Sequence, residues 1–214
     1  MRFRLAPLSL LVPALTVAQQ PPSSEPVWRL DGASPTAGGD RFDRMPPGWH
    51  ITTTDRGGTL LLEGRMVQGR FAVEVELFLF PNPSEVGFGV VLEHRTESAV
   101  AGAMQFLFRR DGSAMAVARH GERDTVLVPW KRDTTIAAHV PAQVTKYVFR
   151  VQHDEGFLAF GINGTEVLAV PTDGMDHAAV PGLRVGPGLN LHISRVDLVT
   201  PLAPPRPRRR ASNE

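Results

Sequence analysis

The sequence predicts an all-β protein, a two-sheet antiparallel β-sandwich of about 12 strands. Short runs of β-forming residues recur along the chain between turn residues, several of them alternate apolar and polar residues, and no segment shows a sustained helical repeat. The runs are 27–30, 50–54, 59–63, 70–80, 85–93, 103–110, 114–120, 125–130, 146–152, 157–162, 166–170, 182–186 and 189–199.

Alternation within the runs assigns their faces. In the run 70–80, every second residue from Phe71 to Leu79 is apolar, whereas Glu74 and Glu76 point to the opposite face. The run 189–199 begins with the same alternation. Strands with one apolar and one polar face are typical of antiparallel sheets, and two such sheets stacked on their apolar faces form a sandwich.

Turn residues support hairpins between several runs. Asp111-Gly112 and Asn163-Gly164 are dipeptides that favour two-residue hairpin turns. The segment 154–156, Asp-Glu-Gly, separates two further runs. We therefore expect a three-stranded meander over 146–170.

The two ends of the chain differ from the body. Residues 1–18 have the pattern of a secretory signal peptide, with two arginines, then an uncharged run at 5–17, then small residues, and we expect cleavage after Ala18. The uncharged run is shorter than the roughly 20 residues that span a bilayer. The sequence thus predicts a secreted or periplasmic protein without a membrane span. The alternative is an uncleaved interfacial helix or a buried strand.

Three further segments follow the leader. Residues 19–26 are predicted to be a flexible lead-in, 27–201 the sandwich domain, and 202–214 a disordered tail rich in proline and arginine. The tail arginines could touch polyanions, although a solvated tail without a partner is the simpler interpretation. They are Arg206, Arg208, Arg209 and Arg210.

Charge and cysteine content exclude several classes of function. The chain carries a net charge of +1, but residues 19–205 hold 17 basic and 21 acidic residues, a net of −4. An acidic body disfavours nucleic-acid binding. The absence of cysteine excludes disulfides, thiolate zinc sites, cysteine nucleophiles and a lipoprotein anchor. We expect a monomer.

Catalytic motifs are missing from the sequence, so no catalytic residue is predicted. The sequence contains no nucleophile elbow, zincin motif, Walker loop or dinucleotide fingerprint. Gly87 and Gly89 lie within a strand pattern, where glycine indicates a bulge or a close backbone approach. Glu74 and Glu76 share a face about 7 Å apart and could act as glycosidase carboxylates, but solvated glutamates on an outer face are the favoured interpretation.

The best metal-ligand cluster is Asp173, Asp176 and His177 in a glycine-containing loop. Oxygen ligands in such a loop could hold a structural calcium ion. The spacing matches no standard calcium or zinc motif, so a plain polar loop is favoured. No other cofactor is expected.

Five stretches of the sequence resemble a known family when they are taken together. They cover 46–81, the glycine-rich EVGFGVVLE at 85–93, 105–119, 147–170 with its "GINGTEVL" hairpin, and 180–199 with its "GLRVG" strand. This order resembles a concanavalin A-like (laminin G-like) jelly-roll domain and is similar to the bacterial exported 3-keto-disaccharide hydrolase domain family. The resemblance implies a sandwich whose concave face meets carbohydrate. It carries over no catalytic residue, because 87–90 departs from the hydrolase pattern.

A set of side chains suits such a ligand. Polar residues that face away from the predicted core can bond sugar hydroxyls, and tryptophans near strand ends can cover the C–H face of a sugar ring. The alternative is that the tryptophans are core residues and the polar residues are merely solvated. The candidates are Trp49, Glu93, Gln105, Arg109, Trp130, Asn190 and His192.

The sequence therefore predicts an exported module that binds a carbohydrate or glycoconjugate. One alternative is a 3-keto-glycoside hydrolase or lyase in which His192 or Glu93 removes a proton. The other is a structural or protein-interaction domain of the cell envelope that uses the arginine-rich tail.

Overall fold

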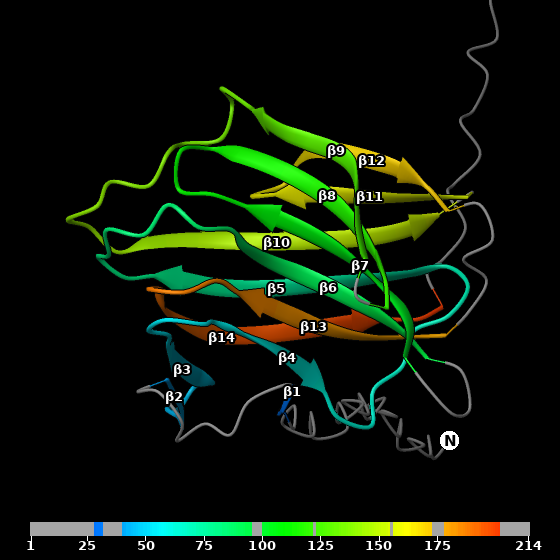
Figure 1. Ribbon diagram of the computed structural model, residues 1–214, viewed down its shortest axis with the longest axis horizontal. Coiled ribbons are helices and arrows are strands. Elements are labelled where there is room, and N and C mark those ends of the chain that lie inside the picture. Colours follow the sequence, from blue (N-terminus) through cyan, green and yellow to red (C-terminus); the bar gives the residue numbers. More distant parts are fainter. Residues whose placement is uncertain are drawn as a thin grey trace, which may run out of the picture.

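The structure, a computed structural model, describes residues 28–31, 40–95, 100–121, 123–154, 156–172 and 178–201. Within these ranges 14 strands form two antiparallel seven-stranded sheets that overlie one another (Figure 1). The predicted all-β sandwich is confirmed. The predicted signal peptide (1–18), lead-in (19–26), tail (202–214) and the cluster of Asp173, Asp176 and His177 lie outside the described residues.

Sheet A has the strand order β1-β4-β13-β6-β7-β8-β9. Its strands are β1 (Trp28–Asp31), β4 (Gly58–Leu62), β13 (Ala179–Val185), β6 (Phe88–Arg95), β7 (Val100–Phe108), β8 (Ser113–His120) and β9 (Arg123–Arg132).

Sheet B has the strand order β12-β11-β10-β5-β14-β3-β2. Its strands are β12 (Thr165–Pro171), β11 (Phe157–Ile162), β10 (Thr145–Asp154), β5 (Phe71–Leu79), β14 (Asn190–Val199), β3 (Trp49–Thr52) and β2 (Arg41–Arg44). The meander predicted over 146–170 is present as β10, β11 and β12.

Strand β2 is not among the predicted runs, because Phe42 is its only apolar residue. The strand forms by pairing with β3 at the edge of sheet B. There the ring of Phe42 stacks on the indole of Trp49, with ring centroids 4.8 Å apart. Its place in the fold thus depends on a tertiary contact rather than on its own pattern.

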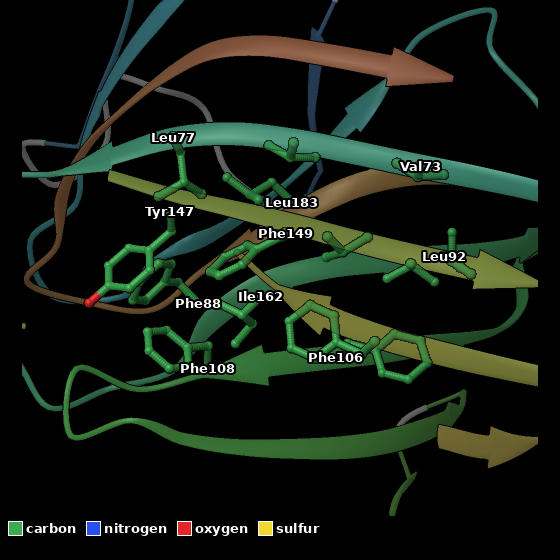
Figure 2. Close-up of a cluster of buried hydrophobic side chains, with 14 of the residues drawn as sticks. Val73, Leu77, Phe88, Leu92, Phe106, Phe108, Tyr147, Phe149, Ile162 and Leu183 are labelled. Atoms are coloured by element: carbon green, nitrogen blue, oxygen red, sulfur yellow. The ribbon is translucent and has the colours of Figure 1, made fainter. Parts of the chain in front are cut away.

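The core lies between the inner faces of the two sheets. Alternate residues of the central strands point inward as predicted, and Figure 2 shows side chains of both sheets meeting there. Aromatic rings join the sheets: Phe88 of β6 lies 5.6 Å from Phe149 of β10, and Phe106 of β7 lies 5.6 Å from Phe160 of β11. Burial of these rings supplies the hydrophobic stabilisation of a chain without disulfides.

The two predicted hairpin turns differ in length. Asn163 and Gly164 form a two-residue turn between β11 and β12, both with positive φ (52° and 84°), as the dipeptide predicts. The connection between β7 and β8 spans four residues, 109–112, so a two-residue turn at Asp111-Gly112 is wrong. The reason is local: a carboxylate oxygen of Asp111 accepts a hydrogen bond from the backbone N–H of Ser113 at 2.9 Å, which favours a wider turn.

Tyr147 carries the one polar atom of the central aromatic cluster, and it lies at one end of that cluster in Figure 2. Its hydroxyl is buried without a hydrogen-bond partner among the described residues, and burial raises its pKa to about 12. Because an unsatisfied buried hydroxyl opposes folding, Tyr147→Phe should leave the free energy of unfolding unchanged or raise it by about 1 kcal/mol. Urea denaturation measures the change. As a control, Phe149→Ala should lower stability by about 3–5 kcal/mol; a comparable loss in Tyr147→Phe would contradict the assignment.

The burial of His139 leads us to expect that the stability of the protein depends on pH. It is buried in the connection between β9 and β10, where its Nδ1 forms a 2.7 Å hydrogen bond with Oγ1 of Thr145. Burial, and secondly the positive charge of Arg110, hold the pKa of His139 below its usual value of 6.5. As the pH falls, His139 is therefore protonated in the unfolded chain before it is protonated in the folded one. The free energy of unfolding that neutral, buried His139 contributes is fully present above pH 6.5 and declines as the pH falls from there toward the folded-state pKa.

The measurement compares the free energy of unfolding of the wild-type protein and of His139→Gln between about pH 8 and pH 5, a range chosen about the histidine pKa. The wild-type protein should lose more stability than the variant as the pH falls. Parallel curves would contradict the prediction.

Candidate functional site

The seven predicted ligand residues divide between the two sheets. Glu93 lies on β6, Gln105 on β7, Arg109 directly after β7, and Trp130 on β9 of sheet A, whereas Trp49 lies on β3 and Asn190 and His192 lie on β14 of sheet B. The five polar residues do alternate with core residues and point outward, as predicted. The seven residues do not share one surface, because the outer faces of the two sheets lie on opposite sides of the sandwich.

The three candidates on sheet B have structural surroundings. Trp49 packs against the core beside Phe42, which is the core alternative considered for it. The Nε2 of His192 donates a 2.9 Å hydrogen bond to the backbone carbonyl of Pro47. The Oδ1 of Asn190 is buried and, among the described residues, has no hydrogen-bond partner.

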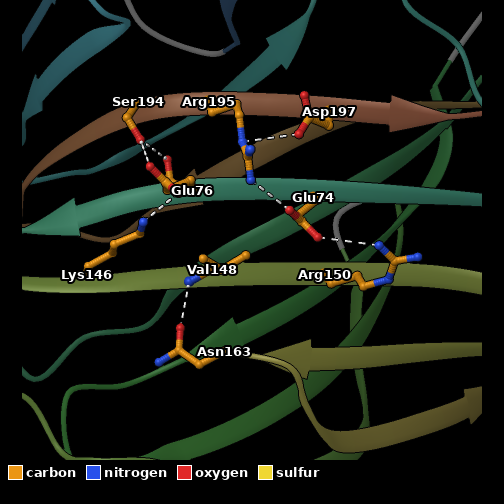
Figure 3. A network of polar contacts seen from close by, with 9 residues as sticks. All are labelled: Glu74, Glu76, Lys146, Val148, Arg150, Asn163, Ser194, Arg195 and Asp197. Atoms are coloured by element: carbon orange, nitrogen blue, oxygen red, sulfur yellow. Dashed lines mark hydrogen bonds and ion pairs between the residues drawn. The ribbon is translucent and has the colours of Figure 1, made fainter.

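The outer face of the central strands β10, β5 and β14 of sheet B carries a ladder of ion pairs (Figure 3). Glu76 lies 2.7 Å from Nζ of Lys146, and Glu74 lies 3.0 Å from Arg195 and 3.4 Å from Arg150. Hydrogen bonds from Lys146 and Ser194 hold the pKa of Glu76 below its usual range. A glycosidase general acid needs a raised pKa, so the geometry does not favour this glutamate pair as catalytic carboxylates.

The outer face of sheet A consists of three rows of residues that are paired across the strands. We call these rows, together with Arg109 and Trp130 next to them, the sheet A face. The middle row is Leu61, Gly182, Val91, Gln105, Val117 and Val126. One flanking row is Val180, Glu93, Ala103, Arg119 and Asp124. The other is Thr59, Arg184, Gly89, Leu107 and Met115.

The middle of the sheet A face is buried although it points away from the core. Leu61, Val91 and Val117 are at most 5% exposed, whereas Glu74 and Phe78 on the outer face of sheet B are half-buried. Two positions on this face are glycine and carry no side chain. A Cβ on Gly89 or Gly182 would collide with a backbone carbonyl of the neighbouring strand. The close backbone approach predicted for Gly89 is therefore confirmed.

Two polar side chains on this face are almost fully buried. Gln105 is 6% exposed and its amide makes no hydrogen bond to any described residue. Glu93, in the adjoining row, is 5% exposed. An amide that lacks a protein partner keeps two N–H donors and a carbonyl acceptor for an external ligand.

Arg109 and Trp130 form a contact at the other end of β7, four residues from Gln105. The guanidinium carbon of Arg109 is 4.1 Å from the centroid of the Trp130 ring. The indole has room because residue 87 is glycine: a Cβ there would lie 2.9 Å from Cη2 of Trp130. Within the described residues, the buried Nε of Arg109 has no hydrogen-bond partner, and the nearest carboxylate, that of Asp111, is 3.8 Å from Nη2.

Arg184 and Arg119 belong to this face but are not among the sequence candidates. Arg119 makes two hydrogen bonds with Asp124, at 2.7 and 2.9 Å, whereas Nη1 of Arg184 donates to Oγ1 of Thr59 at 3.2 Å. Burial lowers the pKa of Arg184, the charge of Arg119 lowers it further, and Asp124 opposes the shift. The alternation of Leu183, Arg184 and Val185 could have identified this arginine as outward-facing.

Metal sites and membrane-spanning helices are absent from the described ranges. No group of three or more histidine, aspartate and glutamate side chains in them could hold a metal ion. The calcium prediction for Asp173, Asp176 and His177 falls outside these ranges and stays a prediction. None of the described segments is a helix long and apolar enough to cross a membrane.

No family model and no curated protein matched the sequence. Among solved structures, the chain is similar to a carbohydrate-binding module, CBM66 from Bacillus subtilis, with a TM-score of 0.58 and 11% identity over 80% of this chain and 94% of that one. It is also similar to a glycoside hydrolase family 16 endo-glucanase from Bacteroides ovatus (TM-score 0.57, 11% identity, 82% and 95% covered).

A third similar structure is the carbohydrate recognition domain of Emp46p in its metal-free form (TM-score 0.56, 13% identity, 80% and 87% covered). At these identities the similarity concerns the fold. The narrower similarity to the 3-keto-disaccharide hydrolase domain stays a prediction. The fold of the chain is a concanavalin A-like jelly roll.

The role of Gly87 in seating Trp130 can be tested by Gly87→Ala. The added methyl group should displace the indole from Arg109 and change the near-UV circular dichroism and fluorescence of Trp130, with a stability loss of about 1–3 kcal/mol. The control is Gly161→Ala in sheet B, where a Cβ would lie 3.3 Å from the backbone oxygen of Thr165. That variant should leave the tryptophan signals unchanged. Equal spectra for both variants and the wild-type protein would contradict the proposed seating.

Proposed function

We propose that this chain is an exported module that binds a carbohydrate or glycoconjugate on the sheet A face. The observation that carries the proposal is the group formed by Gln105, Arg109 and Trp130. The guanidinium of Arg109 lies against the ring of Trp130, and the Gln105 amide faces the same side of the sandwich four residues earlier, about 13 Å along the strand. The export part of the proposal is supported by the signal-like pattern of residues 1–18.

The chemistry of the face suits a sugar. Hydroxyl groups need donors and acceptors in fixed positions, which the Gln105 amide and the Arg109 guanidinium provide. The C–H groups of a sugar ring need apolar contacts, which Val117 in the row of Gln105, Leu107 in the adjoining row, and Trp130 near Gly87 can provide. Because Trp130 and its neighbours hold Arg109 in place, little conformational entropy is lost on binding.

The similar structures support this assignment by their descriptions. Two of them are described as a carbohydrate-binding module and a carbohydrate recognition domain, and both share the sandwich architecture. The hydrolase alternative needs only one base, His192 or Glu93; because these lie on opposite faces of the protein, a substrate on the sheet A face would meet Glu93 alone.

A glycan array followed by calorimetry on the identified ligand tests the proposal. Trp130→Ala and Gln105→Ala should each weaken binding about tenfold or more, because each removes contacts worth at least about 1.4 kcal/mol. His192→Ala and Asn190→Ala are matched controls on sheet B and should leave the affinity unchanged. Circular dichroism establishes that every variant is folded.

Two results would overturn the proposal. One is the absence of binding to every glycan by the folded wild-type protein. The other is binding that is lost in His192→Ala and kept in Trp130→Ala, which would move the ligand to sheet B.

A further inference from the structure

We propose that the ligand of the sheet A face is an acidic saccharide, whose uronate carboxylates are bound by Arg184 and Arg109. This inference rests on the proposed function and adds the class of ligand. It follows from a difference in how the two outer faces of the sandwich use their positive charges.

On the central strands β10, β5 and β14 of sheet B, three outward-facing cations are matched by carboxylates. Lys146, Arg150 and Arg195 each lie within 3.4 Å of a glutamate oxygen, and Asp197 lies 3.1 Å from Arg195 (Figure 3). These pairs satisfy the charges of that face from within the protein. An anionic ligand there would have to displace a glutamate.

On sheet A the charges are matched only in part. Asp124 forms two hydrogen bonds with Arg119 and neutralises it. The guanidinium of Arg184 instead has a neutral hydroxyl, that of Thr59, as its hydrogen-bond partner, and no carboxylate of a described residue lies within ion-pair distance of it. A guanidinium carries five N–H donors in a planar fork that fits a carboxylate.

The surroundings of Arg184 also favour an anion. The residue is partly buried, its pKa is lowered by burial and by the charge of Arg119, and Asp124 relieves the repulsion only in part. Its neighbour across the pair of strands is Gly89, so no side chain stands at that position. A bound carboxylate would meet the guanidinium where the protein itself provides no partner.

Arg109 supplies the second cation. Its guanidinium carbon lies 4.1 Å from the centroid of the Trp130 ring, its buried Nε has no partner among the described residues, and Asp111 is at the long distance of 3.8 Å. Stacking on an indole fixes the plane of the guanidinium. The remaining N–H groups can therefore meet a carboxylate without first being ordered.

The two arginines are spaced for one oligosaccharide. Arg184 pairs with Gly89 of β6, which pairs with Leu107 of β7, and Arg109 follows two residues later. Two strand spacings and two residues along a strand place their backbones about 12 Å apart. Gln105 lies two residues from Leu107 in the opposite direction, about 13 Å from Arg109 along the strand, and can bond hydroxyls of a further sugar residue.

Glu93 does not neutralise either arginine. It lies on β6 four residues from Gly89, so it is about 13 Å along the strand from the row of Arg184. Its carboxylate lies beside Ala103 in the row of Arg119 and Asp124. The row that holds Glu93 and Asp124 is thus separate from the row of Arg184. A bound acidic oligosaccharide would therefore lie along the basic row and away from the acidic one.

Isothermal titration calorimetry with defined oligosaccharides tests the inference. The probes are tetramers of galacturonate, of mannuronate and of guluronate, a hyaluronan tetramer, and the carboxyl-reduced neutral form of each. At least one acidic tetramer should bind, and its neutral form should bind about tenfold more weakly or worse, as the loss of a charge-assisted hydrogen bond predicts.

Variants assign the effect to the named residues. Arg184→Gln should weaken binding of the acidic tetramer about tenfold while changing the affinity for its neutral form little, whereas Arg109→Gln, which also removes donors to hydroxyls, should weaken binding of both forms and of the acidic form more. Arg150→Gln on sheet B is the matched control and should change neither. Arg184→Lys should restore part of the loss, because it keeps the charge but not the fork.

The other outcomes separate this inference from the proposed function. Binding of neutral glycans that depends on Trp130 and Gln105, with acidic tetramers bound no better, would overturn the acidic ligand and keep the carbohydrate-binding module. Equal binding of dextran sulfate that is also lost in Arg150→Gln would indicate general attraction of polyanions and overturn the site. Failure of every neutral and acidic glycan to bind the folded protein would overturn both proposals.

Discussion

The aromatic contact between β6–β7 and β10–β11 fixes the orientation of the other residues in these strands. Phe88, Phe106, Phe108, Phe149 and Phe160 come from both sheets, and their rings lie 5.6–5.8 Å from ring neighbours in this cluster. In a pleated strand, placing one residue inward places the next residue outward. Leu107 and Gln105 therefore point outward because Phe106 points inward. A slip of one residue would bury polar groups and expose phenyl rings, so the core packing also specifies the outer faces.

The outer faces of the two sheets differ in the types of residue that point outward. On sheet B they include glutamates opposite basic residues, as in the pairs Arg150–Glu74 and Arg195–Glu76, so cross-strand pairing satisfies the charges within the sheet. On sheet A they are glycine, alanine, valine and leucine, with a few polar groups among them. Small neighbours give Gln105 and Arg184 few partners of their own. The same strand pattern thus yields one face that is satisfied internally and one that has hydrogen-bonding groups available for a ligand.

The sequence predicted which site residues point away from the core, but not which sheet each of them lies on. Period-2 alternation correctly placed Gln105 and His192 away from the core, but it does not state which sheet a strand joins, and these two residues lie on opposite sides of the molecule. That assignment depends on strand order, which only long-range pairing determines. Strand β2 was missed for the related reason that its formation depends on pairing with β3. Arg184 followed the alternation rule and was overlooked because no recognised motif included it.

Net charge is a poor guide to the ligand of such a face. The region 19–205 carries −4, which would suggest repulsion of an acidic glycan. At physiological ionic strength, charges act over a screening length of about 8 Å, so the glutamates on the outer face of sheet B contribute little at sheet A. Contacts within the face act at hydrogen-bond distance and in partly buried surroundings, where screening is weaker. The sign of the ligand therefore depends on the local pairing of Arg109, Arg119 and Arg184, of which Arg119 alone has a close carboxylate partner among the described residues.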